Sequence, residues 1–285
     1  MDLLYRYPTR LVSLKTPLRY PGGKSRALKK LFHFIPDLSD YTEWREPFLG
    51  GGSMSIEATK RYPHLRVWVN DLYYPVYNFW KHLQSHGETL AKELSTLKDT
   101  HSTPEEARHL FEYAKTLITT DGDEFGDAVR FYIINKCSFS GLSEASSFSK
   151  QASVSNFSYR GIEKLPYYSE LIYRWKITNE SYEELLTHDQ STFTYLDPPY
   201  EISSKLYGKK GSIHRMFNHD VFAENCCYHK GHQLISYNDS PLIRERFDDR
   251  WIDDTYPLTY TMRSKGNYLE DQRDRDELVL YNYGI

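Results

Sequence analysis

Residues 46–53 read Glu-Pro-Phe-Leu-Gly-Gly-Gly-Ser, a strand end followed by three glycines. The sequence then looks helical as far as Arg61, and residues 66–71, Arg-Val-Trp-Val-Asn-Asp, have the β-branched and aromatic content of a strand that ends in an acid. A strand, a glycine loop, a helix and a second strand in this order are typical of the start of a parallel α/β sheet.

The glycine loop predicts a binding site for a nucleoside-containing cofactor. Glycines after a strand let the backbone approach a ligand closely, and the following helix presents N–H groups that have no intrahelical partner. Asp71 lies 19 residues after Gly52, a spacing at which a carboxylate can accept hydrogen bonds from ribose hydroxyls. A dinucleotide fingerprint would need its third glycine where Ser55 stands, so S-adenosylmethionine fits better than NAD. The alternative is a tight turn beside a solvated strand end.

A second glycine pair lies in residues 19–25, Arg-Tyr-Pro-Gly-Gly-Lys-Ser. A P-loop would need a further glycine five residues before Gly23, where Leu18 stands. No clear strand precedes this segment either, so the sequence does not favour ATP binding.

The middle of the chain interrupts the α/β pattern. From about residue 78 to 136 the sequence is helical and polar, and residues 103–106, Thr-Pro-Glu-Glu, form a capping box with proline at the first helical position. Residues 137–165 lose all periodicity. Further strands are predicted at residues 192–196, 233–237 and 277–282. The helical and loop-rich stretch is therefore expected to be an insert in the sheet.

The tetrapeptide Asp197-Pro198-Pro199-Tyr200 carries the most specific chemical signal. Two prolines fix two φ angles and remove two N–H donors, so the chain leaves the sheet with its carbonyls unpaired. The Asp197 carboxylate and the Pro198 carbonyl can then accept both protons of an exocyclic base amine and stabilise the charge that develops on its nitrogen. Tyr200 offers a flat face on which an extruded base stacks, worth about 1–3 kcal/mol. The alternative is a proline turn with a packed tyrosine.

Taken in order, these residues resemble the Dam-type, alpha-group adenine-N6 DNA methyltransferases, in which the cofactor motif precedes the catalytic one. The matching segments are RYPGGK at 19–24, EPFLGGGS at 46–53, Asn70-Asp71, NKCSFSGL at 135–142, DPPY at 197–200, LISYNDS at 234–240 and DELVLYNY at 276–283. Ser140 stands where the family has a second asparagine in the segment that opens its target-recognition region.

The resemblance implies a Rossmann-like S-adenosylmethionine-dependent methyltransferase sheet with a mainly helical target-recognition insert. Residues 1–80 and 187–285 would form the catalytic domain, and residues 81–186 the DNA-binding insert. The implied catalytic residues are Asp197, Pro198, Pro199 and Tyr200. The implied cofactor-binding residues are Tyr20, Gly22, Gly23, Lys24, Pro47, Phe48, Gly50, Gly52, Ser53, Asp71 and Asp197. The implied reaction is in-line attack by adenine N6 on the sulfonium methyl, which leaves S-adenosylhomocysteine and requires neither a covalent cysteine nor a metal.

Double-stranded DNA is the implied partner, and the target base must leave the helix because its N6 is stacked and paired inside a duplex. Basic residues gather in two segments, 203–217, which has no acidic residue, and 130–176, which has seven basic and three acidic residues. The DNA-binding residues expected from these segments are Lys205, Lys209, Lys210, Arg215, Lys136 and Arg160. The alternative for each is a solvated loop residue.

The composition bears on the location of the protein and on whether it binds a metal. No apolar run approaches the roughly 18 residues that span a membrane, and the first residues lack the layout of a secretory signal. Three cysteines cannot build a disulfide framework, so we expect a cytoplasmic protein of a bacterial, archaeal or virus-infected cell. The segment 226–232, Cys-Cys-Tyr-His-Lys-Gly-His, has no second ligand pair at a zinc-site spacing, so no metal is expected.

The net charge of −3 gives no hint of a polyanionic partner, because the basic and acidic segments cancel. We expect a monomer or weak dimer, and the resemblance admits a cognate restriction endonuclease in the same system. Two alternatives stay open from the residues alone. One is methylation of cytosine N4 or of RNA adenine, and the other is a non-catalytic DNA-binding protein of the same fold.

Overall fold

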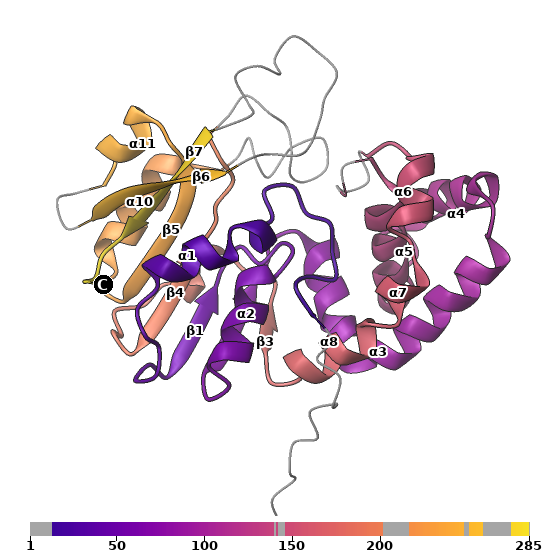
Figure 1. Cartoon of the computed structure of the whole chain (residues 1–285), viewed down its shortest axis with the longest axis horizontal. Coiled ribbons are helices and arrows are strands. Elements are labelled where there is room, and N and C mark those ends of the chain that lie inside the picture. The colour runs from indigo at the N-terminus through magenta and orange to yellow at the C-terminus, as the bar shows by residue number, and fades with distance from the viewer. Residues whose placement is uncertain are drawn as a thin grey trace, which may run out of the picture.

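The computed structural model describes residues 13–139, 141, 146–201, 217–247, 251–258 and 275–284. Within these ranges seven strands form one sheet in the order β3-β2-β1-β4-β5-β7-β6 (Figure 1). The strands are β1 (Glu43–Glu46), β2 (Arg66–Asn70), β3 (Lys176–Thr178), β4 (Thr192–Leu196), β5 (His232–Asn238), β6 (Ile252–Leu258) and β7 (Arg275–Tyr281). Strands β1 to β5 are parallel, and β7 runs antiparallel to both of its neighbours, β5 and β6.

The strand order reverses between β1 and β4. The chain moves outward from β1 through β2 to β3 and then returns to form β4 on the other side of β1. In an open α/β sheet, ligands bind in the crevice outside the carboxyl ends of the strands at such a switch point. The fold therefore predicts a ligand-binding site at the loops after β1 and β4.

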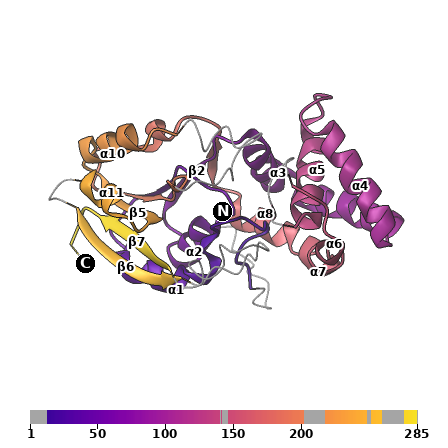
Figure 2. The same ribbon diagram turned by 90° about the horizontal axis from the view of Figure 1, so that it is seen from above.

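Helices cover both faces of the sheet (Figure 2). The described helices are η1 (Lys24–Arg26), α1 (Leu28–Phe34), α2 (Ser53–Arg61), α3 (Tyr74–Thr100), α4 (Pro104–Leu117), α5 (Glu124–Cys137), α6 (Lys150–Ser155), α7 (Tyr159–Ile162), α8 (Leu165–Ile172), η2 (Tyr182–Leu185), α10 (His219–Tyr228) and α11 (Pro241–Glu245). Because side chains alternate along a strand, β4 sends Phe193 and Tyr195 into a large core with Trp44, whereas Leu196 joins Phe222 in a smaller core under α10 and α11.

Helix α3 joins the sheet to the helical insert, which lies beside it in Figure 1. The backbone of α3 is non-helical at His86, and a Cβ on Gly87 would stand 2.4 Å from the Cβ of Ser169 in α8. The glycine thus permits a close helix crossing where α3 bends. The larger core continues without a break from Trp44 in β1 to Phe111 in α4, so the sheet and the insert share apolar packing.

The predicted α/β class is confirmed, and so is the capping box of α4, in which Thr103 and Glu106 exchange hydrogen bonds. Two strands were not predicted. Strand β6 contains Asp253, Asp254 and Pro257, which are uncommon in strands but tolerated at a sheet edge. Strand β3 has three residues, too few to show alternation, and it lies inside the 81–186 range assigned to the insert.

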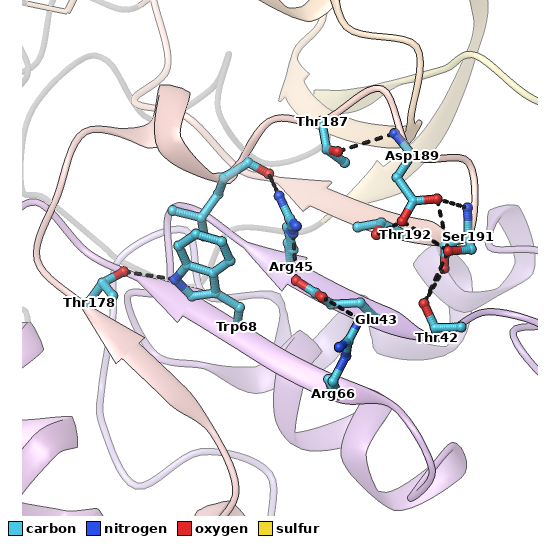
Figure 3. A network of polar contacts seen from close by, with 11 residues as sticks. Thr42, Glu43, Arg45, Arg66, Trp68, Thr178, Thr187, Asp189, Ser191 and Thr192 are labelled. Atoms are coloured by element: carbon cyan, nitrogen blue, oxygen red, sulfur yellow. Dashed lines mark hydrogen bonds and ion pairs between the residues drawn. The ribbon is translucent and has the colours of Figure 1, made fainter.

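A polar network covers the face of β1 and β2 opposite α2 (Figure 3). Glu43 forms ion pairs with Arg45 at 2.7 Å and with Arg66 at 3.2 Å, and the Arg45 guanidinium lies 4.8 Å from the centre of the Trp68 ring. Arg45 also donates to the carbonyl of Leu185 at 3.1 Å, which attaches η2 to the sheet. Glu43 and Arg66 begin their strands, so their ion pair lies at the opposite end of the sheet from the switch-point crevice.

Candidate active site

A pocket occupies the switch point. It opens to solvent at one end of the sheet. Its walls come from the segments after β1, β2 and β4 and from the turn before η1. The lining residues include the predicted cofactor residues Tyr20, Gly23, Lys24, Pro47, Phe48, Gly50, Gly52, Ser53, Asp71 and Asp197. The sheet thus brings together residues that are as far apart in the sequence as Tyr20 and Asp197.

The glycine loop takes its shape from two residues with left-handed backbone. Gly50 has φ +45° and a Cβ there would lie 2.7 Å from the Tyr20 ring, while Gly52 has φ +65° and a Cβ there would lie 2.6 Å from the Trp80 ring. Side chains are disfavoured at both positions by conformation and by space. Trp80 also donates its indole N–H to the Gly50 carbonyl at 2.9 Å. The loop therefore rests on two aromatic rings.

Asp71 closes the loop from the end of β2. One carboxylate oxygen accepts the N–H of Gly50 at 2.8 Å, and the other accepts the N–H of Tyr73 at 2.9 Å. Burial raises the pKa of Asp71 to about 6, although both N–H donors oppose the rise. Each oxygen keeps a second lone pair, so the carboxylate can hold the loop and still accept a ligand hydroxyl.

Lys24 is the buried cation of the pocket. Its side chain is 3% exposed, and its ammonium donates to the Gly22 carbonyl at 3.0 Å, to Asp197 Oδ1 at 2.8 Å and to the Tyr200 hydroxyl at 2.8 Å. Burial lowers the pKa of Lys24, but the carboxylates of Asp197 and Glu277 outweigh burial and hold it well above the ordinary value. Lys24 is therefore charged whenever the pocket is at neutral pH.

Asp197 stands on the rim of the pocket, where β4 ends. Burial raises the pKa of its carboxyl to about 6; Lys24 opposes the rise and Glu277 adds to it. The side chain keeps 21% of its surface exposed, so it can meet a ligand that enters the pocket. Lys24 contacts Oδ1.

The two residues after the prolines are firmly anchored. Pro198 and Pro199 are buried, and the ring of Tyr200 stacks on Tyr237 at a centroid distance of 6.0 Å. Glu201 donates its N–H to Asn238 at the end of β5 at 3.1 Å, and its carboxylate receives both terminal nitrogens of Arg246 at 2.5 and 3.1 Å. These contacts fix where the tetrapeptide leaves the sheet.

The pocket has an aromatic end that sequence reasoning found only in part. Phe48 stacks on Tyr182 of η2 at 5.5 Å and meets Phe217 edge to face at 5.8 Å. Tyr182 and Phe217 were not predicted, although both line the pocket. Tyr182 follows β3, and recognising that short strand would have placed it at the carboxyl edge of the sheet.

Glu46 is a third carboxyl in the pocket, and the sequence analysis did not predict it. It is 3% exposed, and its Oε2 accepts the backbone N–H of Ser55 at 2.9 Å and also the Ser55 hydroxyl. Burial raises its pKa to about 8 against these two hydrogen bonds, and the charges of Asp197 and Asp71 add to the rise. The pocket thus holds three carboxyls and one lysine.

The predicted DNA-binding residues differ in exposure and in whether they lie within the described ranges. Arg160 is exposed on α7, whereas Lys136 is 9% exposed at the end of α5, where burial and the nearby Arg19 lower its pKa to about 7. Four predicted residues lie outside the described ranges, namely Lys205, Lys209, Lys210 and Arg215. All six roles stay predictions.

Asn135 connects the insert with the start of the cofactor segment. Its side chain accepts the N–H of Arg19 at 2.9 Å and donates to the carbonyls of Arg19 and Gly141, both at 2.7 Å. Arg19 precedes Tyr20, whose ring covers the glycine loop. The asparagine quoted for the family resemblance therefore has a structural task at the boundary between insert and pocket.

In the described ranges, no group of three or more His, Cys, Asp or Glu side chains is arranged to hold a metal ion. Cys226 is buried and Cys227 half-buried, and the neighbouring His229 stacks on His188 at 4.9 Å. Among the helices that the structure describes, none combines the length and apolarity that a bilayer crossing needs.

Comparison with known proteins points to one enzyme family. The family model described as D12 class N6 adenine-specific DNA methyltransferase matches residues 20–262. Type II methyltransferase M.MjaIII of Methanocaldococcus jannaschii is 25% identical over 68% of this chain and 72% of its own length. Type II methyltransferases M.CviBI of Paramecium bursaria Chlorella virus NC1A and M1.LlaDCHI of Lactococcus lactis subsp. cremoris are each 23% identical, over 95% and 96% of this chain and 100% and 97% of their own.

The matched region runs from Tyr20 at the glycine loop to beyond the tetrapeptide 197–200 and covers most of the chain. The chain therefore belongs to the D12 class N6 adenine-specific DNA methyltransferases. The predicted family is confirmed, and with it adenine N6 of DNA as the methylated position, rather than cytosine N4 or an RNA base.

Proposed function

We propose that this methyltransferase uses S-adenosylmethionine to methylate adenine within one DNA sequence, as the modification enzyme of a type II restriction system. The observation that carries the proposal is Asp197, held by Lys24 on the rim of a pocket whose other walls are the glycine loop and Asp71. The type II names of the three relatives support the pairing with a restriction endonuclease.

The pocket suits S-adenosylmethionine in its charge and in the side chains that line it. At neutral pH Glu46, with a pKa of about 8, is mostly protonated, so the ionised carboxylates of Asp71 and Asp197 face the single Lys24. This balance suits a ligand with two positive groups and one carboxylate. Phe48 and Tyr182 offer ring faces for an adenine, Asp71 lies at the ribose-accepting position, and Tyr20 and Lys24 complete the polar end.

Bound S-adenosylmethionine supplies a methyl group made electrophilic by its positive sulfur. The chain supplies acceptors for the amine that attacks. The Asp197 carboxylate and the Pro198 carbonyl accept the two N6 protons, which orients the nitrogen lone pair and stabilises its developing charge. With a pKa of about 6, Asp197 is mostly ionised at neutral pH and can take up the proton that the methylated amine loses.

The insert and the segment after the tetrapeptide provide the DNA contacts in this proposal. We assign target recognition to residues 81–186, apart from the edge strand β3, with Arg160 exposed toward solvent on α7. Lys205, Lys209, Lys210, Arg215 and Lys136 complete the predicted phosphate-binding set. The enzyme would act on double-stranded DNA as a monomer or weak dimer in the cytoplasm of its host, with Tyr200 as the platform for the extruded base.

The test is methyl transfer from labelled S-adenosylmethionine to duplex DNA, followed by nucleoside digestion and mapping of the methylated positions. We expect N6-methyladenine within one short sequence. Asp197→Asn should lower kcat at least about 1,000-fold and leave DNA binding within about twofold. The matched control is Asp37→Asn, which changes an exposed acid in the segment before β1 that does not line the pocket, and which should retain full activity.

Three results would count against the proposal. Absence of label in every duplex removes the cofactor assignment. Methylation scattered over unrelated sequences removes the restriction-system role. Full activity in Asp197→Asn removes the catalytic assignment of that carboxylate.

A further inference from the structure

A buried carboxylate lies beneath the catalytic tetrapeptide. Glu277 in β7 is 1% exposed and is not among the residues that line the pocket. Its Oε2 accepts the hydroxyl of Tyr200 at 2.5 Å and that of Tyr256 at 3.2 Å, and the Lys24 ammonium lies 3.5 Å from the same oxygen. The chemistry described above gives this group no part.

The hydrogen bonds of this cluster can be assigned by counting donors. An ammonium has three N–H bonds, and Lys24 has three close acceptors, the Gly22 carbonyl, Asp197 Oδ1 and the Tyr200 hydroxyl. Because Tyr200 accepts from Lys24, its only proton must go elsewhere, and Glu277 receives it. One chain of hydrogen bonds therefore runs from Glu277 through Tyr200 and Lys24 to Asp197.

The antiparallel direction of β7 explains why an acid from near the end of the chain reaches this point. Glu277 pairs with Asn238, the last residue of β5, and with Tyr256 in β6. Since β7 runs opposite to β5, the start of β7 lies at the edge of the sheet where β4 and β5 end. The same edge carries Asp197 and the Asn238 side chain that holds Glu201.

We propose that Glu277 is a positioning residue for methyl transfer, which fixes Lys24 and the Tyr200 ring before DNA binds and keeps Asp197 disposed to accept the amine proton. The proposal rests on the role of Asp197 given under Proposed function. When the new N6–methyl bond forms, N6 becomes positively charged. It returns to neutrality when one N–H bond breaks and the proton forms an O–H bond with Asp197, so no further reactant is needed.

The charges around Asp197 determine in which direction its pKa should move when the Glu277 charge is removed. The groups that face it are Lys24 from η1, Glu277 from β7, Glu46 from β1, Tyr195 from β4, Tyr256 from β6 and Tyr200 beside it. Burial raises the pKa of Asp197 and Glu277 adds to the rise, while Lys24 opposes it. Removal of the Glu277 charge should therefore lower the pKa of Asp197.

The experiment measures single-turnover methylation against pH for Glu277→Gln, Tyr200→Phe, the double variant and Tyr256→Phe, together with S-adenosylmethionine affinity by calorimetry. In Glu277→Gln we expect the rate at pH 7.5 to fall at least about tenfold and the acidic limb of the profile to move down by about one pH unit. Cofactor affinity should stay within about threefold. Tyr256→Phe, which removes a hydroxyl from the same carboxylate without a change of charge, should keep the acidic limb in place.

The double variant provides the sharpest criterion. If Glu277 acts through Tyr200, the double variant should be no slower than the worse single variant, because both remove the same link. Multiplicative losses, or an unmoved acidic limb in Glu277→Gln, would overturn the proposal. If Glu277→Gln does not fold, Tyr200→Phe decides: a rate within twofold of that of Tyr256→Phe also overturns it. An inactive wild type would instead overturn the proposed function, and this inference with it.

Discussion

Substitution of alanine for Gly52 tests how the glycine loop builds the pocket. Gly52 precedes the first turn of α2 with φ +65°, and a Cβ there would lie 2.6 and 2.9 Å from two carbons of the Trp80 ring. Trp80 is fully buried and supports the loop through its hydrogen bond to the Gly50 carbonyl. An alanine must therefore adopt a disfavoured backbone and displace a packed ring.

Two costs add up to the expected destabilisation. The left-handed conformation costs a non-glycine residue about 1–2 kcal/mol. Forcing an extra methyl into a packed core costs about 1–3 kcal/mol. Gly52→Ala should therefore lower the free energy of unfolding by about 2–5 kcal/mol. The matched control is Gly122→Ala, since Gly122 has φ +75° but no atom within 4 Å of its Cβ position, so that only the first cost, about 1–2 kcal/mol, applies.

Urea unfolding and calorimetric titration of S-adenosylmethionine measure the two consequences. Gly52→Ala should lose at least about tenfold in cofactor affinity, which is about 1.4 kcal/mol, because the displaced Trp80 no longer holds the loop. Gly122→Ala should bind the cofactor like the wild type. Equal destabilisation of the two variants with unchanged affinity in Gly52→Ala would refute this account of the loop.

Three further predictions concern ligand, fold and DNA. Because burial raises the pKa of Asp71 to about 6 and only the ionised form attracts a cationic ligand, S-adenosylmethionine affinity should fall as the pH drops from about 7 through 6; calorimetry should find this slope reduced in Asp71→Asn. Asn135→Ala removes three hydrogen bonds to Arg19 and Gly141 and should lower the free energy of unfolding in urea by about 2–4 kcal/mol. A decrease under about 0.5 kcal/mol would contradict the structural role given to Asn135. Arg160→Ala should reduce the salt dependence of DNA binding by about one phosphate contact and leave kcat unchanged, as filter binding at several salt concentrations would show.

The sequence alone was enough for the local parts of the site. Gly50 and Gly52 indicate a loop after a strand in which the backbone can approach a ligand, and the Pro198-Pro199 pair indicates a chain that must leave the sheet. These features can be read from the sequence because glycine widens, and proline restricts, the backbone angles allowed at its own position, whatever surrounds it. The α/β class followed for the same reason, from strands and helices whose patterns are local.

Tertiary structure changed what some of these residues do. Asp71 was predicted to face a ribose, and the structure shows that it also holds the loop through the N–H groups of Gly50 and Tyr73. Tyr200 was predicted only as a stacking surface, and the structure places its hydroxyl between Lys24 and Glu277. Neither contact leaves a periodic pattern in the sequence.

The polar centre of the site was decided by the sheet alone. Lys24 in η1 meets Asp197 across 173 residues, and Tyr200 meets Glu277 across 77. The second contact depends on which strands are neighbours and in what register. A backbone preference acts within one or two residues, and so composition and motif predict it. An ion pair between distant segments depends on the order β1-β4-β5-β7, which the chain acquires only when its strands are paired.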